Sequence, residues 1–317
     1  MGNLGIQNIE DSGLVPTEYA EEIVKEVKGE SILLTYGTKR QMSTSDLSQP
    51  VLEESPDAYF LESNGLVPPS TAKWKNAGLK AGTLIVYVPI QKSLLEDSSY
   101  DIYSDIVEEG SKKLGLAFDN AGLFGVGKPL TWSESVYELA TKVGNSVAVD
   151  KNKDLTVAIP ELATKIGTQG FKINGFIVPN GTDWYLRGLR DSKGAPLYSP
   201  NVQEKDSGLL YGFPIPDLSS SCFEKKKVKT IMVDWRKVRV GVRRDLRIEK
   251  LDQAVISDEE GKVIYNLSQA DAVAFKLTMR VGFSIANPVT ELQKDASKRA
   301  PVGIITGDAS TQPVTLS

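Results

Sequence analysis

The sequence contains no histidine, and this absence excludes a large part of enzyme chemistry. Without histidine there is no Ser-His-Asp or Cys-His pair to activate a nucleophile, and no HExxH zinc site. Cys222 is the single cysteine, so the chain can form neither an internal disulfide nor a thiolate zinc site. Enzymes that use carboxylates, lysine or tyrosine are not excluded by composition, but we predict no catalytic residue, no bound metal and no cofactor.

Long apolar runs are also missing. The longest, Leu84 to Ile90, is interrupted by Pro89 and is far too short to span a bilayer. The first residues, MGNLGIQNIEDSG, lack the basic region and apolar block of a secretory signal. The net charge of -4 over 317 residues favours neither nucleic acid nor an anionic membrane. We therefore expect a chain of about two domains with no membrane partner.

The strongest pattern that is present runs from Ser98 to Ala121 and predicts a long amphipathic helix. Its apolar residues recur at helical spacing: Ile102, Ile106, Val107, Leu114, Ala117, Phe118 and Ala121. At about 1.5 Å per residue the helix would be roughly 35 Å long. Gly110 and Gly115 would each weaken it by about 1 kcal/mol relative to alanine, so packing must hold it. We expect the rest of the chain to be built on this helix.

Residues 17–28 predict a shorter amphipathic helix that includes Tyr19 and Ile23 and ends at Gly29. Two interpretations stay open. It is either an ordinary surface helix or an arm that crosses to a neighbouring subunit. Ile32, Leu33 and Leu34 follow it and are interpreted as a short strand.

Residues 51–89 contain few helix signals and predict a long two-stranded excursion. Its tip would lie near residues 63–71, where Asn64, Gly65, Pro68 and Pro69 indicate turns. The return strand would run from about 72 to 90. Exposed aromatics such as Tyr59, Phe60 and Trp74 would need a surface to cover them, either another copy of the chain or the hairpin's own domain.

The remaining elements are predicted from local signals. Residues 133–143 favour a helix capped by Ser133, and Thr182 or Asp183 would cap a short one. Residues 154–168 are ambiguous, because Pro160 must either start a helix or kink one. The expected strands are 171–179, 209–218, 227–235, 236–248 and 268–286. From Pro288 onward the chain is polar, and we expect it to fray.

Gly122 to Lys128, GLFGVGK, matches the spacing of a phosphate-binding loop. The next residue should be Ser or Thr, but it is Pro129, and the motif follows a helix where a strand is required. A flexible turn is the favoured interpretation.

Asp150, Asn152, Asp154 and Glu161 stand at positions 1, 3, 5 and 12 of a calcium-loop pattern. Leu155 replaces the glycine that the sharp turn at position 6 needs. A solvated acidic turn is therefore favoured over a calcium site.

Basic residues cluster near Trp235: Arg236, Lys237, Arg239, Arg243, Arg244 and Arg247. They could form a nucleic-acid patch. However, Val238, Val240 and Val242 alternate with them, which is typical of a half-buried strand. Nearby acids, including Glu249 and Asp252, could pair with them, so we favour the structural interpretation.

Five segments in order resemble the major capsid proteins of tailed bacteriophages, which have the Hong Kong 97-like fold. ESNGLVPPSTAKW with TLIVYVPI is similar to the family's extended loop, and residues 98–121 to its spine helix. FIVPNGTDWYLRGLRDSKGAPLYSP with LLYGFPIPDL resembles its axial domain. IMVDWRKVRVGVRRDLRIEK and FKLTMRVGFSIANPVTELQ resemble its closing strands.

The resemblance implies an α+β fold with an N-terminal arm, an extended β-hairpin loop, a peripheral domain with a long spine helix, and an axial domain. The segments implied are the arm and first strand 1–50, extended loop 51–89, peripheral domain 90–144, axial domain 145–235, return strands 236–293 and tail 294–317. The residues implied in contacts between subunits are Tyr19, Ile23, Asn64, Gly65, Pro68, Pro69 and Trp74.

The function implied is a structural protein that self-assembles into hexamers and pentamers of an icosahedral phage head around double-stranded DNA. Expected partners are other copies of the chain, a separate scaffolding protein, a portal, and DNA through non-specific contact. The protein would be made in the host bacterial cytoplasm and reside in the virion. Lys73, Lys75 and Lys80 lie in the loop, but no partner for a covalent crosslink is identified.

Two alternatives remain open at this point. An encapsulin-like nanocompartment shares the fold but encloses protein cargo. A calcium- or nucleotide-binding enzyme would instead be built on residues 150–161 or 122–128.

Overall fold

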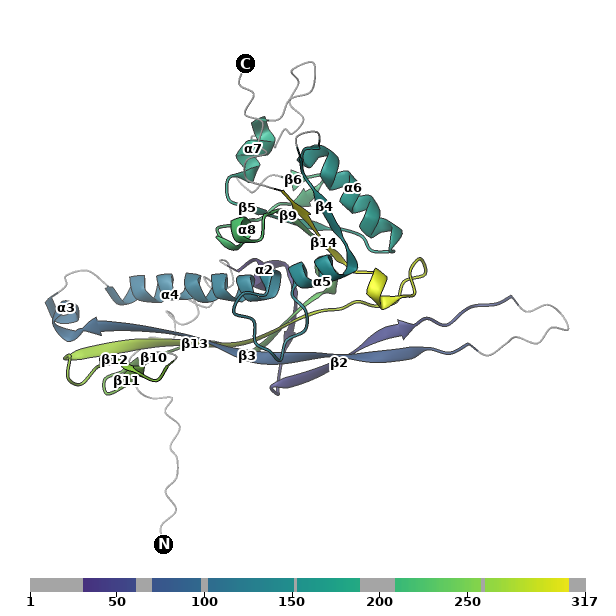
Figure 1. The fold of residues 1–317 in the computed structure, drawn as a ribbon. Helices are drawn as coiled ribbons and strands as arrows, with labels where there is room; N and C mark the ends of the chain where they lie inside the picture. Colours follow the sequence, from purple (N-terminus) through teal and green to yellow (C-terminus); the bar gives the residue numbers. More distant parts are fainter. Residues whose placement is uncertain are drawn as a thin grey trace, which may run out of the picture.

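A computed structural model describes residues 31–60, 70–97, 102–150, 153–188, 209–257 and 260–307. The predicted helix at 17–28 lies outside these ranges. The described chain contains two five-stranded sheets, and Figure 1 shows an elongated lower layer of long strands beneath a smaller upper unit. The order of the elements follows the chain: α2 Ile32–Tyr36, β1 Thr38–Gln41, β2 Asp46–Glu54, β3 Lys73–Gln91, α3 Lys92–Asp97, α4 Ile102–Asp119, η1 Asn120–Phe124, α5 Val136–Val143, β4 Ser146–Ala148, α6 Leu155–Thr168, β5 Gly175–Pro179, α7 Thr182–Gly188, β6 Leu209–Leu210, β7 Phe213–Pro214, β8 Asp217–Leu218, α8 Cys222–Lys225, β9 Val228–Val233, η2 Trp235–Lys237, β10 Val238–Leu251, β11 Val255–Ser257, β12 Val263–Asn266, β13 Ala272–Ile285, η3 Ala296–Lys298 and β14 Val302–Thr306.

The lower layer is a sheet in the order β1-β10-β13-β3-β2, which we call the long sheet. Its strands are antiparallel except for β1, which pairs parallel with β10. The predicted strands at 236–248 and 268–286 are confirmed as β10 and β13. Val238, Val240 and Val242 of β10 are buried, as their alternation predicts.

Helix α4 lies along one face of the long sheet (Figure 1). Ile106 and Leu114 pack against Phe275 and Leu277 of β13. A Cβ atom on Gly110 would come within 2.8 Å of the Leu277 side chain, so the glycine allows a close approach of helix to strand. The glycines that weaken this helix in isolation are therefore part of its packing. The prediction of a long helix is confirmed from Ile102, and residues 98–101 lie outside the described ranges.

The upper unit contains the second sheet, in the order β4-β14-β9-β5-β8. Helix α6 packs on it through Leu162 and Ile166, which lie close to Gly303 of β14. Asp154 caps this helix, and the helix continues through Pro160, which resolves the ambiguity of residues 154–168. Within the described residues, no helix has the length and apolar character needed to cross a bilayer.

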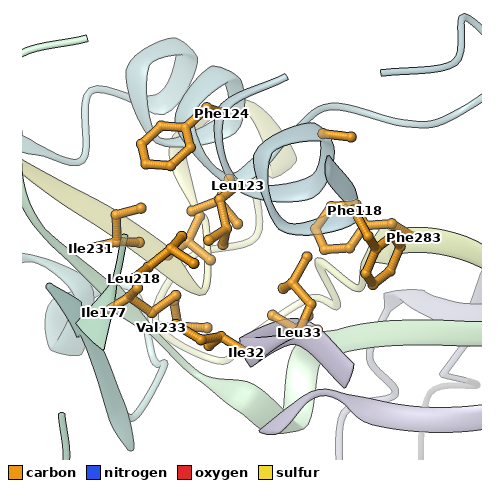
Figure 2. Packing of buried hydrophobic residues seen from close by; sticks show 14 of the residues in the cluster. Ile32, Leu33, Phe118, Leu123, Phe124, Ile177, Leu218, Ile231, Val233 and Phe283 are labelled. Carbon is orange, nitrogen blue, oxygen red and sulfur yellow. The ribbon is translucent and has the colours of Figure 1, made fainter. Parts of the chain in front are cut away.

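The two layers meet at a shared apolar core (Figure 2). It draws side chains from α2, the end of α4, η1 and both sheets: Ile32, Leu33, Phe118, Leu123, Phe124, Ile177, Ile231, Val233 and Phe283. At its edge, Asp119 is completely buried and accepts hydrogen bonds from the Ser31 hydroxyl at 2.8 Å and the Ile32 and Leu33 N–H groups at 2.8 and 3.1 Å. The carboxylate thus satisfies the free N–H groups at the start of α2.

This interaction explains one wrong prediction. Ile32, Leu33 and Leu34 form helix α2 and not a strand, because Ser31 caps the first turn and Asp119 binds its N–H groups from 86 to 88 positions away. Two smaller predictions were also wrong. Ser135, with Glu138 in a capping box, starts α5 in place of Ser133. Thr182 belongs to α7 itself.

The expectation of fraying from Pro288 onward is also wrong, for residues up to Gly307. Strand β14 is buried between β4 and β9 in the second sheet. Its residues Val302, Ile304 and Ile305 are 0 to 2% exposed. The segment 294–307 therefore contributes to the core and is not a tail. The other domain boundaries stay a prediction.

We expect opposite effects from two alanine substitutions at helical glycines. In Gly122→Ala the new Cβ would meet Leu33 at 2.5 Å and Phe283 at 3.1 Å in the buried junction, which should cost about 1–3 kcal/mol. In Gly167→Ala nothing lies within 4 Å, so the better helix propensity should add up to about 1 kcal/mol. Urea unfolding of the unassembled subunit measures both. Equal effects would contradict this account of the junction.

The second prediction concerns pH. Burial raises the pKa of Asp119 from its ordinary 3.8 to about 6, against the opposing effect of its hydrogen bonds. The folded-state pKa lies above the unfolded one, so the stability it contributes is present at low pH and lost as pH rises through about 6. Between pH 4.5 and 7.5 the loss should be on the order of 2 kcal/mol.

Asp119→Asn should remove this pH-dependent component of the unfolding free energy, whatever its effect on absolute stability. The exposed Asp46→Asn is the matched control and should keep the wild-type slope. An unchanged slope in Asp119→Asn would show that Asp119 does not titrate in this range.

Candidate functional site

The hairpin formed by β2 and β3 projects from the rest of the described chain. The two strands pair from Asp46 opposite Lys80 to Glu54 opposite Lys73, and Figure 1 shows them extending beyond the rest of the molecule. The predicted two-stranded excursion is confirmed, although it begins at Asp46 and not at 51. Its base packs on its own chain, where Val51 is buried and the Leu52 carbonyl accepts a hydrogen bond from Val289 N at 2.9 Å, whereas its outer part extends away from the described chain.

Of the residues predicted to contact other subunits, the structure describes Trp74, which lies on β3 opposite Leu52 and is 64% exposed. The others lie outside the described residues: Tyr19, Ile23, Asn64, Gly65, Pro68 and Pro69. Phe60 is fully exposed and Tyr59 half exposed on the outgoing side of the hairpin. An isolated two-stranded ribbon with exposed aromatics is marginal in water, so it requires a covering surface.

The base of the hairpin is anchored by glycines in the long sheet. Gly241 and Gly282 are register partners on β10 and β13. A Cβ atom on Gly241 would lie 2.7 Å from Leu79, and one on Gly282 would lie 2.7 Å from the Lys80 carbonyl oxygen. Leu79 is completely buried there. The absence of two side chains therefore lets β3 cross closely over the sheet before it projects outward.

The basic residues near Trp235 are largely used within the fold. Arg236 binds the Asp234 carboxylate at 2.9 Å, and Arg247 contacts Glu249 at 3.1 Å. Arg243 donates to the backbone carbonyls of Met42 and Ser43. These contacts favour the structural interpretation over a continuous nucleic-acid patch. Arg244 forms no ion pair within the described ranges, and neither does Arg280 on the adjacent strand.

The calcium-loop pattern is helical from Leu155 onward. Asp154 accepts hydrogen bonds from Thr156 N and Val157 N as the cap of α6, so the later positions of the motif are helical. Glu161 lies within that helix and pairs with Lys153. Among the described residues, no group of three acidic or cysteine side chains is placed to hold a metal ion.

Gly122 and Lys128 of the phosphate-loop pattern likewise have structural roles. Gly122 lies in η1, a π-helical turn that continues α4, and it is packed against Leu33. Lys128 binds the Glu138 carboxylate and the Ser133 carbonyl. Its ammonium group therefore contributes to the start of α5.

Buried polar residues that the sequence pattern does not reveal hold the two sheets in place. Arg299 is 1% exposed and its guanidinium donates to backbone carbonyls of the segment after β13, including Pro288 O at 2.8 Å. Asn145 and Gln169 bond each other, and Asn145 also donates to Ala300 O and Val302 O at the start of β14. Such residues resemble ordinary surface positions until their distant partners are known.

Comparison with known proteins identifies a family and several similar proteins. The phage capsid family matches residues 12–290. The major capsid protein of Staphylococcus phage 80alpha is 25% identical over 282 residues, which cover 87% of this chain and 82% of that protein. The major capsid protein of Klebsiella oxytoca phage phiKO2 is 23% identical and is covered over 67% of its length.

Chains in solved phage structures are also similar to this chain. A chain from Microbacterium phage Oxtober96 is 27% identical with a TM-score of 0.73, and one from Mycobacterium phage Bobi is 25% identical with a TM-score of 0.74. In both cases the match covers 88% of this chain and 91% of the other chain.

The third prediction tests the buried arginine. Arg299→Met keeps the apolar stem but leaves the carbonyls of the 287–294 segment without their donor, which should cost about 3 kcal/mol of unfolding free energy. Lys298→Met, at the neighbouring exposed position, should change stability by no more than about 0.5 kcal/mol. Thermal and urea unfolding measure the difference, and similar values for the two variants would refute the role of the guanidinium.

Proposed function

The chain belongs to the phage capsid family, and from this premise we propose that its copies join through the hairpin and the second sheet into the hexamers and pentamers of an icosahedral phage head. The protein is a major capsid subunit and resides in the virion. The Hong Kong 97-like α+β fold inferred from the sequence is confirmed.

The observation that carries the assembly mechanism is the projecting hairpin. It exposes Trp74, Tyr59 and Phe60 on the outer part of a ribbon that the rest of the described chain leaves uncovered. A neighbouring subunit would bury these aromatics, and each such contact needs to be only modest. Many identical contacts add to a stable shell, because each subunit is held by several neighbours at once.

Further partners are proposed on the same basis. The head would enclose double-stranded DNA through non-specific contact, and a portal and a separate scaffolding protein would take part in assembly. The similarity to phage major capsid proteins supports a DNA-filled head over the protein-filled nanocompartment. The family role is structural. The use of Asp154 as the cap of α6, and of Lys128 in an ion pair with Glu138, argues against an enzyme built on either motif.

The fourth prediction tests assembly directly. The protein expressed alone, or with its scaffolding protein, should form closed shells or ring-shaped capsomers in negative-stain electron microscopy and size-exclusion chromatography. A variant with Tyr59, Phe60 and Trp74 changed to serine should remain an unassembled subunit with an unchanged circular dichroism spectrum. Leu130→Ser is the control, because Leu130 is as exposed as Phe60 but lies outside the hairpin.

A wild-type chain that stays a 34.5 kDa monomer even with scaffolding protein would contradict the proposed function. Assembly by the triple serine variant would contradict the role of the hairpin. The contents of purified particles, measured by mass spectrometry and nuclease treatment, distinguish DNA from protein cargo.

A further inference from the structure

A hollow in the upper unit is lined almost entirely by apolar side chains, and we call it the aromatic hollow. It lies between α6, the β6–β7 hairpin and the second sheet, and its volume is about 440 Å³. Pockets that bind small molecules usually have volumes between about 300 and 1,000 Å³. The walls of the aromatic hollow include Ala163, Phe171, Lys172, Phe176, Tyr211 and Phe213. Figure 1 shows β6 next to α6 in this part of the molecule.

Four aromatic side chains contribute to the walls of the hollow. Phe171 and Phe176 are buried and belong to the apolar core beneath α6. Phe213 lies beside Phe176, with the two ring centroids 6.4 Å apart. Tyr211 lies at the rim, where it is 60% exposed. A flat aromatic ligand could pack against these rings edge-to-face or offset-stacked, which are the arrangements that aromatic groups prefer.

The α6 side of the hollow has shorter side chains. Pro160 and Ala163 both line it, and they share one face of the helix because they are three positions apart. Neither side chain is long enough to fill the space next to the rings. The described chain therefore leaves a narrow apolar space between the helix and the aromatic side chains.

Tyr211 has an unusual backbone conformation. Tyr211 and Gly212 are the two central residues of the turn that joins β6 to β7, and their φ angles are 53° and 81°. Glycine adopts a positive φ readily, and asparagine, aspartate or glycine is the usual residue at the first position of such a turn. Strained residues of this kind cluster at ligand-binding and other functional sites. The turn thus holds a large ring at the hollow, at a position where a smaller residue would be less strained.

The rim of the hollow carries positive charge. Of the described residues that line the hollow, Lys172 alone is charged, and it forms no ion pair with another described residue. Arg236 is close to it, because the guanidinium lies 3.5 Å from the Lys172 carbonyl oxygen, although Asp234 also binds this guanidinium. The rim therefore favours an anionic group, whereas the interior favours an uncharged apolar body.

These two features together restrict the chemistry of the ligand. An inorganic anion would occupy only the rim and leave the rings uncovered. A neutral hydrocarbon would make no use of Lys172. A flat ring that carries one carboxylate satisfies both parts of the hollow.

We propose that the aromatic hollow binds small aromatic carboxylates, with the ligand ring between α6 and the Phe176, Phe213 and Tyr211 side chains, and the carboxylate toward Lys172. The site goes beyond the proposed function, and it can be studied on the unassembled subunit. A ligand there contacts α6, the β6–β7 hairpin and the second sheet at once. It should therefore stabilise the folded chain, because a ligand that binds only the folded state raises its stability.

Three probes test the chemical class of the ligand by titration calorimetry and thermal unfolding of the full-length subunit. Naphthoate should bind and raise the unfolding temperature. Naphthamide, which is neutral, should bind about three- to five-fold more weakly, because an exposed ion pair contributes only modestly. Laurate has the carboxylate without a ring and should bind more weakly than naphthoate. Laurate binding as tight as that of naphthoate would overturn the aromatic assignment, and no binding of naphthoate would overturn the site.

Substitutions test the location of the site. Ala163→Phe should fill the space next to the rings and abolish naphthoate binding. Lys172→Met should lower the affinity for naphthoate about three- to five-fold and leave the affinity for naphthamide unchanged. Lys225→Met, at an exposed position of α8, is the control and should change neither affinity. Wild-type affinity in Ala163→Phe would overturn the location, and equal effects of the two lysine substitutions would overturn the role of Lys172.

Tyr211→Asn separates ligand binding from a role in the turn, and it tests the site even if Ala163→Phe does not fold. Asparagine tolerates a positive φ, so the unliganded variant should be at least as stable to urea as the wild type. Its affinity for naphthoate should fall about two- to ten-fold through the loss of one aromatic contact. A variant that loses stability but keeps its affinity would overturn the role of Tyr211 in binding. None of these measurements involves assembly, so failure of the site would leave the capsid function intact.

Discussion

The described fold depends on one buried carboxylate. Asp119 ends helix α4 and binds the first N–H groups of α2, which places Ile32 and Leu33 in the core between the two sheets. Fully burying a charged group is expensive unless it is hydrogen-bonded, and here three donors converge on it. The helix, the long sheet and the second sheet all contact this junction, so their relative positions follow from it.

Around the junction, glycines are as important for the packing as the apolar side chains. Gly110 and Gly122 let the helix layer approach Leu277 and Phe283, and the glycine pair 241 and 282 lets the hairpin cross the sheet. At each of these positions glycine lowers the local helix or strand propensity, but it permits close contact between the layers. The long sheet can consequently be rigid at its centre while one of its strands continues into the exposed hairpin.

Features with a short-range periodic signal could be predicted from the sequence. Alternation in β10, the apolar stripe of α4 and the turn residues near Asn64 identified these elements and the hairpin, and their order carried the resemblance to capsid proteins. The errors share a physical cause. Helix α2 depends on Asp119, and β14 depends on Arg299 and Asn145, whose partners lie far away in the sequence.

The position of β14 has a consequence for synthesis on the ribosome. This strand, residues 302–306, lies between β4 and β9 and pairs with both. The second sheet therefore lacks an inner strand until residues 302–306 have been made, and a chain that ends before them exposes the facing edges of β4 and β9. A chain that ends before residue 302 cannot complete the second sheet. Formation of the second sheet is thereby coupled to the synthesis of residues 302–306, although β4, β5 and β9 all precede them in the chain.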